Sequence, residues 1–161
     1  MSTVATDIAA VRRIVADVVD PEIPVLTIED LGVLRDVTVD EHGHVEVTIT
    51  PTYSGCPAMG VIADDIRDAL HTAGLEGVVR TVLAPAWTTD WMTDAGRARL
   101  TAYGIAPPQP RNGTVDLQLS VRCPQCGSPD TRQVSRFGST PCQAQWVCTQ
   151  CKEPFDEFKT H

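Results

Sequence analysis

Residues 33–59, VLRDVTVDEHGHVEVTITPTYSGCPAM, contain two runs in which apolar and polar residues alternate. Alternation with a period of two is typical of a half-buried strand, and the DEHGH segment between the runs supplies a glycine for a turn. The stretch therefore predicts an antiparallel hairpin. Its second strand leads directly into a single cysteine, Cys56, which is followed by Pro57.

Helical patterns lie on both sides of this hairpin. Before it, apolar residues recur at steps of three and four, and Pro21 ends the pattern. These residues are Val4, Ile8, Val11, Val15 and Val18. After it, Met59, Ile62, Ile66 and Leu70 form a second stripe, and the strand-like run VVRTVLA follows. The order α-β-β-α-β predicts an α+β fold, in which a small mixed sheet carries helices on one face.

A linker is expected directly after residue 106. The segment APPQPRNG contains three prolines and a glycine. We therefore expect an α+β domain over residues 1–106, a Pro-rich linker over 107–113 and a small domain over 114–161. The charge changes at the same place, because residues 1–110 carry 7 basic and 16 acidic side chains, whereas residues 111–161 carry 6 and 5.

Composition argues against several classes of protein. The net charge of −8 disfavours a nucleic-acid binder, since phosphate backbones are bound mainly by clustered Lys and Arg. No apolar run approaches the roughly 18 residues that a membrane span needs, and the N-terminus lacks the apolar core of a signal peptide. We expect a cytoplasmic protein. Six cysteines without an export signal favour metal ligands or reactive thiols over disulfides.

The strongest motif is a pair of Cys-x-x-Cys turns in the small domain. Cys123 and Cys126 form the first, and Cys148 and Cys151 form the second. Four thiolates suit tetrahedral zinc. A segment this small buries too little apolar surface to be stable without a cross-link such as a bound metal, so the pattern predicts a zinc ribbon. An iron centre in the same thiolates and a redox dithiol are the alternatives. A fifth thiol, Cys142, is either a buried apolar side chain, or an exposed thiol that transfers metal or sulfur, or a replacement for one of the four ligands.

Cys56 has two interpretations of equal weight. Because Pro57 suits the first position of a helix, Cys56 is expected at the N-cap, where the helix dipole would lower the pKa of its thiol and favour a metal-binding thiolate. Alternatively, it is a small buried residue at a tight turn. One thiolate cannot hold a metal firmly, so Asp20, Glu22, Cys142 or a second copy of the chain would have to add ligands.

Two tryptophans, Trp87 and Trp91, lie in the loop PAWTTDWM. Each either caps the core or belongs to a docking surface, since aromatic anchors supply much of the energy of protein interfaces.

Several separate motifs resemble one family. DPEIPVLTIEDLGVLRDV, TPTYSGCPAM, PAWTTDWM, CPQCGS and FGSTPCQAQWVCTQCKEPFDEFK are similar to the D subunits of bacterial phenylacetyl-CoA epoxidase systems, over nearly the whole chain. Residues 1 to about 106 resemble the wider metal-sulfur cluster assembly domain family, and residues 111–161 resemble the zinc-ribbon extension of the D-subunit family itself. The resemblance carries over Asp20, Pro21, Glu22 and Cys56 as cluster-assembly positions, and the four ribbon cysteines and Cys142.

The resemblance implies a cytoplasmic accessory protein of aerobic phenylacetate degradation. Its expected partners are the oxygenase and reductase components of the epoxidase, and its expected role is assembly or delivery of iron or iron-sulfur clusters. The competing hypothesis is a stable structural or regulatory subunit that docks through the ribbon and the tryptophan loop. An independent enzyme is disfavoured because four cysteine ligands close a zinc site and no catalytic triad, carboxylate pair or phosphate loop is recognisable.

Overall fold

A computed structural model describes residues 6–109 and 120–161. The chain divides into two compact units, residues 1–87 and residues 88–161. This division differs from the domain border at residue 106 expected from the sequence. Most of the expected linker, residues 110–113, and Val4 of the first helical stripe lie outside the described residues.

The first unit is built on a three-stranded sheet of order β1-β2-β3. Its strands are β1 (Leu34–Val39), β2 (Val45–Ile49) and β3 (Gly77–Thr81). β1 and β2 form the predicted antiparallel hairpin, with Val37 opposite Val47. β3 pairs with β2 in parallel, so the connection between them must cross over the sheet. The sheet is therefore mixed, as the sequence predicts.

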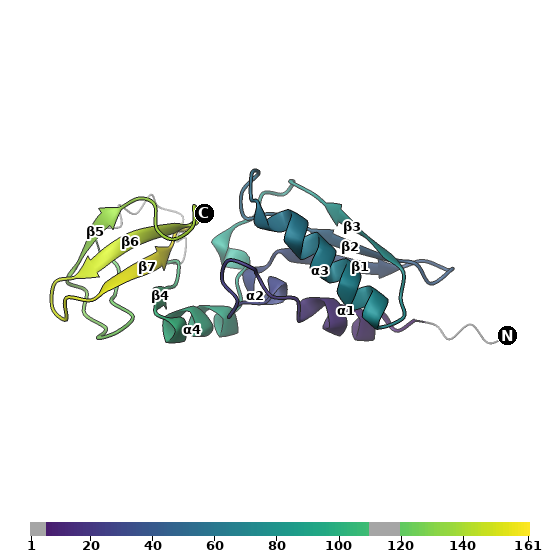
Figure 1. Ribbon diagram of the computed structural model, residues 1–161, viewed down its shortest axis with the longest axis horizontal. Coiled ribbons are helices and arrows are strands. Elements are labelled where there is room, and N and C mark those ends of the chain that lie inside the picture. The colour runs from purple at the N-terminus through teal and green to yellow at the C-terminus, as the bar shows by residue number, and fades with distance from the viewer. Residues whose placement is uncertain (1–5, 110–119) are drawn as a thin grey trace. The chain divides into compact units, whose positions relative to one another are not determined.

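Helices cover one face of this sheet (Figure 1). They are α1 (Ile8–Ala16), the one-turn α2 (Ile28–Leu31) and α3 (Ala58–Thr72), which is the crossover between β2 and β3. α1 begins at Asp7, whose side chain accepts from the backbone N–H of Ala9, and α2 begins with a capping box between Thr27 and Asp30. The helices bury apolar stripes against the sheet: Val11 and Val15 from α1, and Ala58, Ile62, Ile66 and Leu70 from α3.

Trp87 is the last residue of the first unit and lies in its core. Its indole Nε1–H donates to the carbonyl oxygen of Leu31 at 2.9 Å, and the side chain is only 6% exposed. The docking role considered for Trp87 is therefore corrected: the ring lies in the core. Trp91 belongs to the second unit and is half-buried.

The second unit combines a helical segment with a four-stranded sheet of order β4-β7-β6-β5. Its elements are η1 (Thr89–Trp91), α4 (Asp94–Tyr103), β4 (Ile105–Ala106), β5 (Thr131–Ser135), β6 (Gln143–Cys148) and β7 (Pro154–Phe158). The two-residue β4 pairs in parallel with β7. This pairing explains why residues 88–106 group with the ribbon and not with the first unit.

No helix among the described residues is both long and apolar enough to cross a membrane.

The crossover packs tightly at Gly77. A Cβ there would lie 2.6 Å from Cδ1 of Leu70 and 3.0 Å from the carbonyl oxygen of Val45. We therefore expect Gly77→Ala to lower the free energy of unfolding by about 1–3 kcal/mol, because the backbone oxygen cannot move aside. Urea unfolding followed by circular dichroism at 222 nm measures the change.

The matched control is Gly60→Ala, on the exposed side of α3. Its Cβ would have no neighbour within 4 Å. Alanine at this position should raise the free energy of unfolding by about 0.5–1 kcal/mol, since glycine is a poor helix former. A Gly77→Ala protein as stable as the wild type would contradict the close packing of α3 on the sheet.

Candidate functional site

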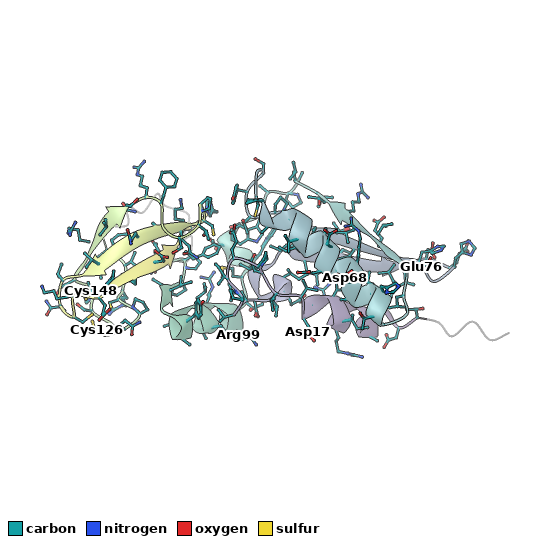
Figure 2. The ribbon with its side chains drawn as sticks, viewed as in Figure 1. Asp17, Asp68, Glu76, Arg99, Cys126 and Cys148 are labelled. Carbon is teal, nitrogen blue, oxygen red and sulfur yellow. The ribbon has the colours of Figure 1, made fainter. Side chains whose placement is uncertain are left out.

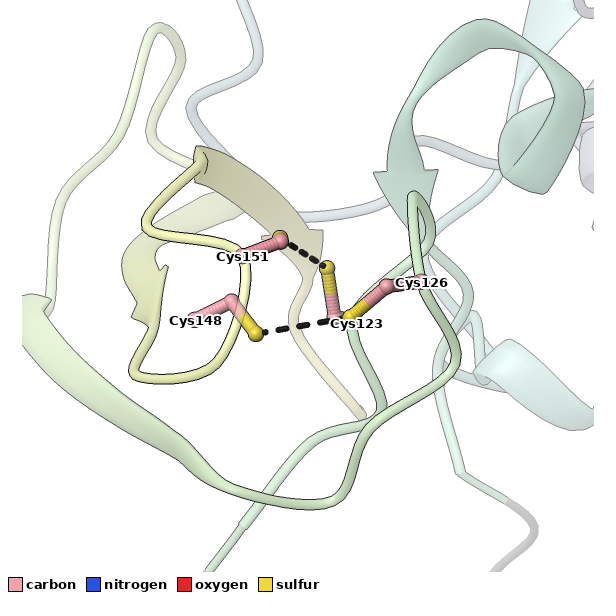
Figure 3. Close-up of side chains that lie close together, drawn as sticks. All are labelled: Cys123, Cys126, Cys148 and Cys151. Atoms are coloured by element: carbon pink, nitrogen blue, oxygen red, sulfur yellow. Dashed lines mark hydrogen bonds between the residues drawn. The ribbon is translucent and has the colours of Figure 1, made fainter.

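The four ribbon cysteines converge on one point. The Sγ atoms of Cys123, Cys126, Cys148 and Cys151 all lie within 4.8 Å of one another. Sγ of Cys123 is 3.7 Å from that of Cys151, and Sγ of Cys126 is 3.6 Å from that of Cys148 (Figure 3). A tetrahedral ion with metal–sulfur bonds of about 2.3 Å holds its sulfurs roughly 3.8 Å apart. The cluster therefore has the dimensions of a four-thiolate metal site.

Two similar turns, one in each Cys-x-x-Cys segment, orient these thiols toward one another. In the first, the N–H of Gly127 donates to the carbonyl of Cys123, and Gly127 has a φ of 73°. In the second, the residue after the last cysteine is again left-handed, since Lys152 has a φ of 67°. Each Cys-x-x-Cys segment is thus followed by a reversal of the chain. Lys152 gave no sequence signal for this turn, because a left-handed conformation is uncommon for a residue with a side chain.

The site is half-buried. Cys123 and Cys148 are 2% and 0% exposed and belong to the ribbon core, while Cys126 and Cys151 are exposed. Figure 2 shows Cys126 and Cys148 together at one end of the ribbon unit. The backbone N–H of Cys151 lowers the pKa of the Cys148 thiol to about 7. Against a hydrogen bond from the N–H of Glu153, burial and the neighbouring thiols raise the pKa of Cys151 to about 12. The thiols therefore do not ionise alike in the absence of a cation, and a cation bound between them would favour the thiolate form of each.

Cys142 lies apart from this cluster. Its side chain is 6% exposed, and its sulfur is 2.9 Å from Oγ1 of Thr140. It is not among the four thiols that could share an ion. The structure therefore favours the buried-thiol interpretation over an exposed transfer thiol.

Loss of one cluster ligand should abolish metal binding. We expect Cys151→Ala to lose the metal held by the wild type and to melt the ribbon strands, because a structural ion of this kind supplies on the order of 10 kcal/mol of folding free energy. Elemental analysis of the purified protein measures the metal. Cys142→Ala is the control and should keep the wild-type metal content; equal loss in both variants would contradict the assignment of the ligands.

Cys56 lies between β2 and α3, where the sequence predicts it, but in a different electrostatic setting. The N-cap of α3 is Pro57, and no side chain caps the helix. The thiol is half-buried, and this burial raises its pKa. The N–H of Ala58 donates to the sulfur and opposes the increase. The expectation of a thiol with a lowered pKa at the N-cap is therefore wrong.

Two carboxylates act on this thiol through their charge. The negative charges of Glu22 and Asp20 raise the pKa of Cys56 further, so the fold brings the thiol near a turn that lies far from it in the sequence. A hydrogen bond from the hydroxyl of Thr52 opposes this increase, a contact that the sequence did not suggest. The result is a half-buried thiol with a raised pKa in the neighbourhood of two acidic side chains.

Asp20 has a structural task as well. Its Oδ1 accepts from the N–H groups of Glu22 and Ile23, both at 2.8 Å, and it is 8% exposed. Burial raises the pKa of the Asp20 carboxyl against these two hydrogen bonds. Glu22 is more open, and burial followed by the charge of Asp20 raises its pKa. Asp20 therefore fixes the turn, and Glu22 is the freer of the two carboxylates.

The Cys56 group is not a complete metal site by itself. Among the described residues, the ribbon cysteines are the one set of three or more Cys, His, Asp or Glu side chains close enough to share an ion. Any cation at Cys56 would need movement of Glu22 or further ligands from outside this group.

The raised pKa of Cys56 makes a testable difference to its reactivity. Because alkylation requires the thiolate, the midpoint of its pH–rate profile should lie above the value of about 8.5 found for free cysteine. Glu22→Gln removes a negative charge and should lower that midpoint. Iodoacetamide alkylation in a Cys142→Ala background, read by mass spectrometry of the Cys56 peptide, measures both. A midpoint below that of free cysteine would restore the helix-dipole interpretation.

Two families match successive parts of the chain. Residues 8–84 match the model of the family described as iron-sulfur cluster assembly protein, and residues 107–159 match that of the PaaD zinc beta ribbon domain.

Individual relatives agree with these matches. A protein of Escherichia coli named as the D subunit of 1,2-phenylacetyl-CoA epoxidase is 50% identical over 147 residues, which cover 91% of this chain and 88% of that protein. An Fe-S protein maturation auxiliary factor of Porphyromonas gingivalis is 37% identical and covers 55% of this chain and 85% of its own. The crystal structure of a domain of unknown function, DUF59, from Bacillus anthracis has 31% identity and a TM-score of 0.54, with 58% and 90% covered.

Proposed function

Because this chain belongs to the family of 1,2-phenylacetyl-CoA epoxidase D subunits, we propose that it is a non-catalytic maturation factor of that epoxidase in the cytoplasm. Its cargo is iron or an iron-sulfur cluster, which it holds transiently at Cys56 and delivers to the oxygenase or reductase component. The observation that carries this proposal is the half-buried thiol of Cys56 at the turn into α3, close enough to Asp20 and Glu22 for their charges to raise its pKa.

The chemistry of this group suits transient binding. Thiolate and carboxylate together provide soft and hard donors, and three groups that can be anionic attract a cation. Burial raises the pKa of all three groups, so each holds a proton more tightly than the same group does in water. A cation competes with protons for these groups, so its binding should weaken as the pH falls. The incomplete ligand set leaves positions for a client's own ligands during transfer.

The ribbon has a different task. Four thiolates at tetrahedral spacing fit zinc, which Cys123, Cys126, Cys148 and Cys151 would hold with no position left for water. A closed site of this type stabilises a fold and performs no chemistry. The family name of residues 107–159 supports zinc as the resident ion.

Iron uptake tests the proposal directly. Wild type, Cys56→Ala and Cys142→Ala are purified without oxygen, incubated with Fe²⁺ and sulfide, desalted and analysed for zinc, iron and acid-labile sulfide per chain. We expect one zinc in all three, and iron in the wild type and in Cys142→Ala alone. Glu22→Gln should take up iron more weakly than the wild type. Equal iron in the Cys56→Ala protein would disprove a carrier role for this thiol.

A second candidate is a stable, non-catalytic subunit that transfers nothing. The name of the Escherichia coli relative as a subunit favours it. Stoichiometric copurification with the oxygenase that is unaffected by Cys56→Ala, together with unchanged epoxidase activity in cells, would select this candidate over the maturation factor.

A further inference from the structure

The ribbon unit exposes two apolar side chains close together in sequence. Val134 is 53% exposed on β5, and Phe137 is 70% exposed in the turn that follows. β5 is the last strand of the order β4-β7-β6-β5, so one of its edges is unpaired in the described sheet (Figure 1). A phenylalanine with this exposure buries little of its apolar surface within its own unit.

The turn that carries Phe137 is well ordered by hydrogen bonds. The N–H of Phe137 donates to Oγ of Ser135 at 3.1 Å, and the N–H of Gly138 donates to the carbonyl of Gln143 at 2.8 Å. A Cβ on Gly138 would lie 2.8 Å from Oδ1 of Asp156, so the turn also packs closely on β7. The ring is therefore presented in one place, and binding it costs little conformational entropy.

Three cationic side chains lie near this ring in the sequence or in space. Nζ of Lys159 lies 4.9 Å from the centroid of Phe137 and donates to the carbonyl of Arg136 at 3.1 Å. Arg132 and Arg136 are exposed, and residues 131–142 contain no carboxylate, although Asp156 of β7 reaches the turn and accepts from Oγ of Ser139 at 2.6 Å. None of these three cations forms an ion pair within the described parts of the chain. In a protein of net charge −8, this is an unusual local excess of positive charge.

We propose that these residues form a docking surface for an acidic protein partner. The cationic aromatic surface consists of Arg132, Val134, Arg136, Phe137 and Lys159. Phe137 enters an apolar pocket of the partner, and the arginines pair with carboxylates around that pocket. The proposal rests on the proposed function in one respect, the choice of an epoxidase component as the partner.

The charge distribution favours a protein over a nucleic acid. Residues 1–87 carry 14 acidic and 5 basic side chains, which repel a polyanion whose charge continues along its length. A protein can offer a few carboxylates locally beside an apolar pocket. Aromatic and arginine side chains are the residue types that most often dominate such interfaces, and complementary charge steers the encounter.

Binding to the purified oxygenase and reductase components tests this surface. The dissociation constant is measured by surface plasmon resonance with the full-length, zinc-loaded chain at several salt concentrations. We expect Phe137→Ala and Arg136→Glu each to weaken binding by about tenfold or more, and Arg136→Lys to stay within about threefold of the wild type. Higher salt should weaken wild-type binding. Tyr103→Ala is the control, since this aromatic ring of the same unit is 56% exposed and lies on α4.

Several outcomes would overturn the proposal. They are wild-type affinity in Phe137→Ala and Arg136→Glu, affinity independent of salt, and no binding of the wild type to any component. Tight binding of a fluorescent single-stranded oligonucleotide that is lost in these variants would assign the surface to nucleic acid instead. Zinc content reports folding in each variant. Failure of the two proposals is distinguishable, because Cys56→Ala should dock normally and Phe137→Ala should take up iron normally.

Discussion

The parallel pairing of β2 with β3 is the constraint on which the first unit depends. Two parallel neighbours require a crossover, and α3 provides it over the same face that α1 covers. The turn from β2 into this helix is therefore fixed at the carboxyl end of the strands, and Cys56 lies in that turn. Asp20 holds the 20–23 turn with two backbone hydrogen bonds, so the position of its carboxylate is fixed independently of the thiol.

The second unit obeys a different constraint. Its core cluster consists of a few side chains, and two of its most buried members, Cys123 and Cys148, are also metal-site thiols. The ion and the core therefore stabilise the same strands, which is expected where a chain segment is too short to bury much apolar surface. One unit thus offers an incomplete set of ligands and the other a complete one. The first set suits exchange of a cation, and the second suits its permanent retention.

Much of this architecture could be predicted from the sequence, because alternation in β1 and β2 and the apolar stripe of α3 are local signals. The spacing of the two Cys-x-x-Cys pairs was an equally direct signal of the four-thiolate site. The predictions failed where the deciding partner is distant in sequence. The pKa of Cys56 is raised first by burial and then by the charges of Glu22 and Asp20, and buried Trp87 hydrogen-bonds the carbonyl of Leu31. A strand of two residues, β4, carries no periodic pattern, so its pairing with β7 and the resulting unit border could not be anticipated.

That short strand has a consequence for how the ribbon could be moved between proteins. A fragment cut at the proline-rich segment would begin after Ala106 and would leave β7 without its parallel neighbour. It would also separate the backbone of His161 from Thr89, whose N–H donates to the carbonyl of His161 at 3.1 Å. A fragment meant to fold as the complete second unit should therefore begin at residue 88, immediately after Trp87. In chimaeras, the fusion joint belongs between Trp87 and Thr88.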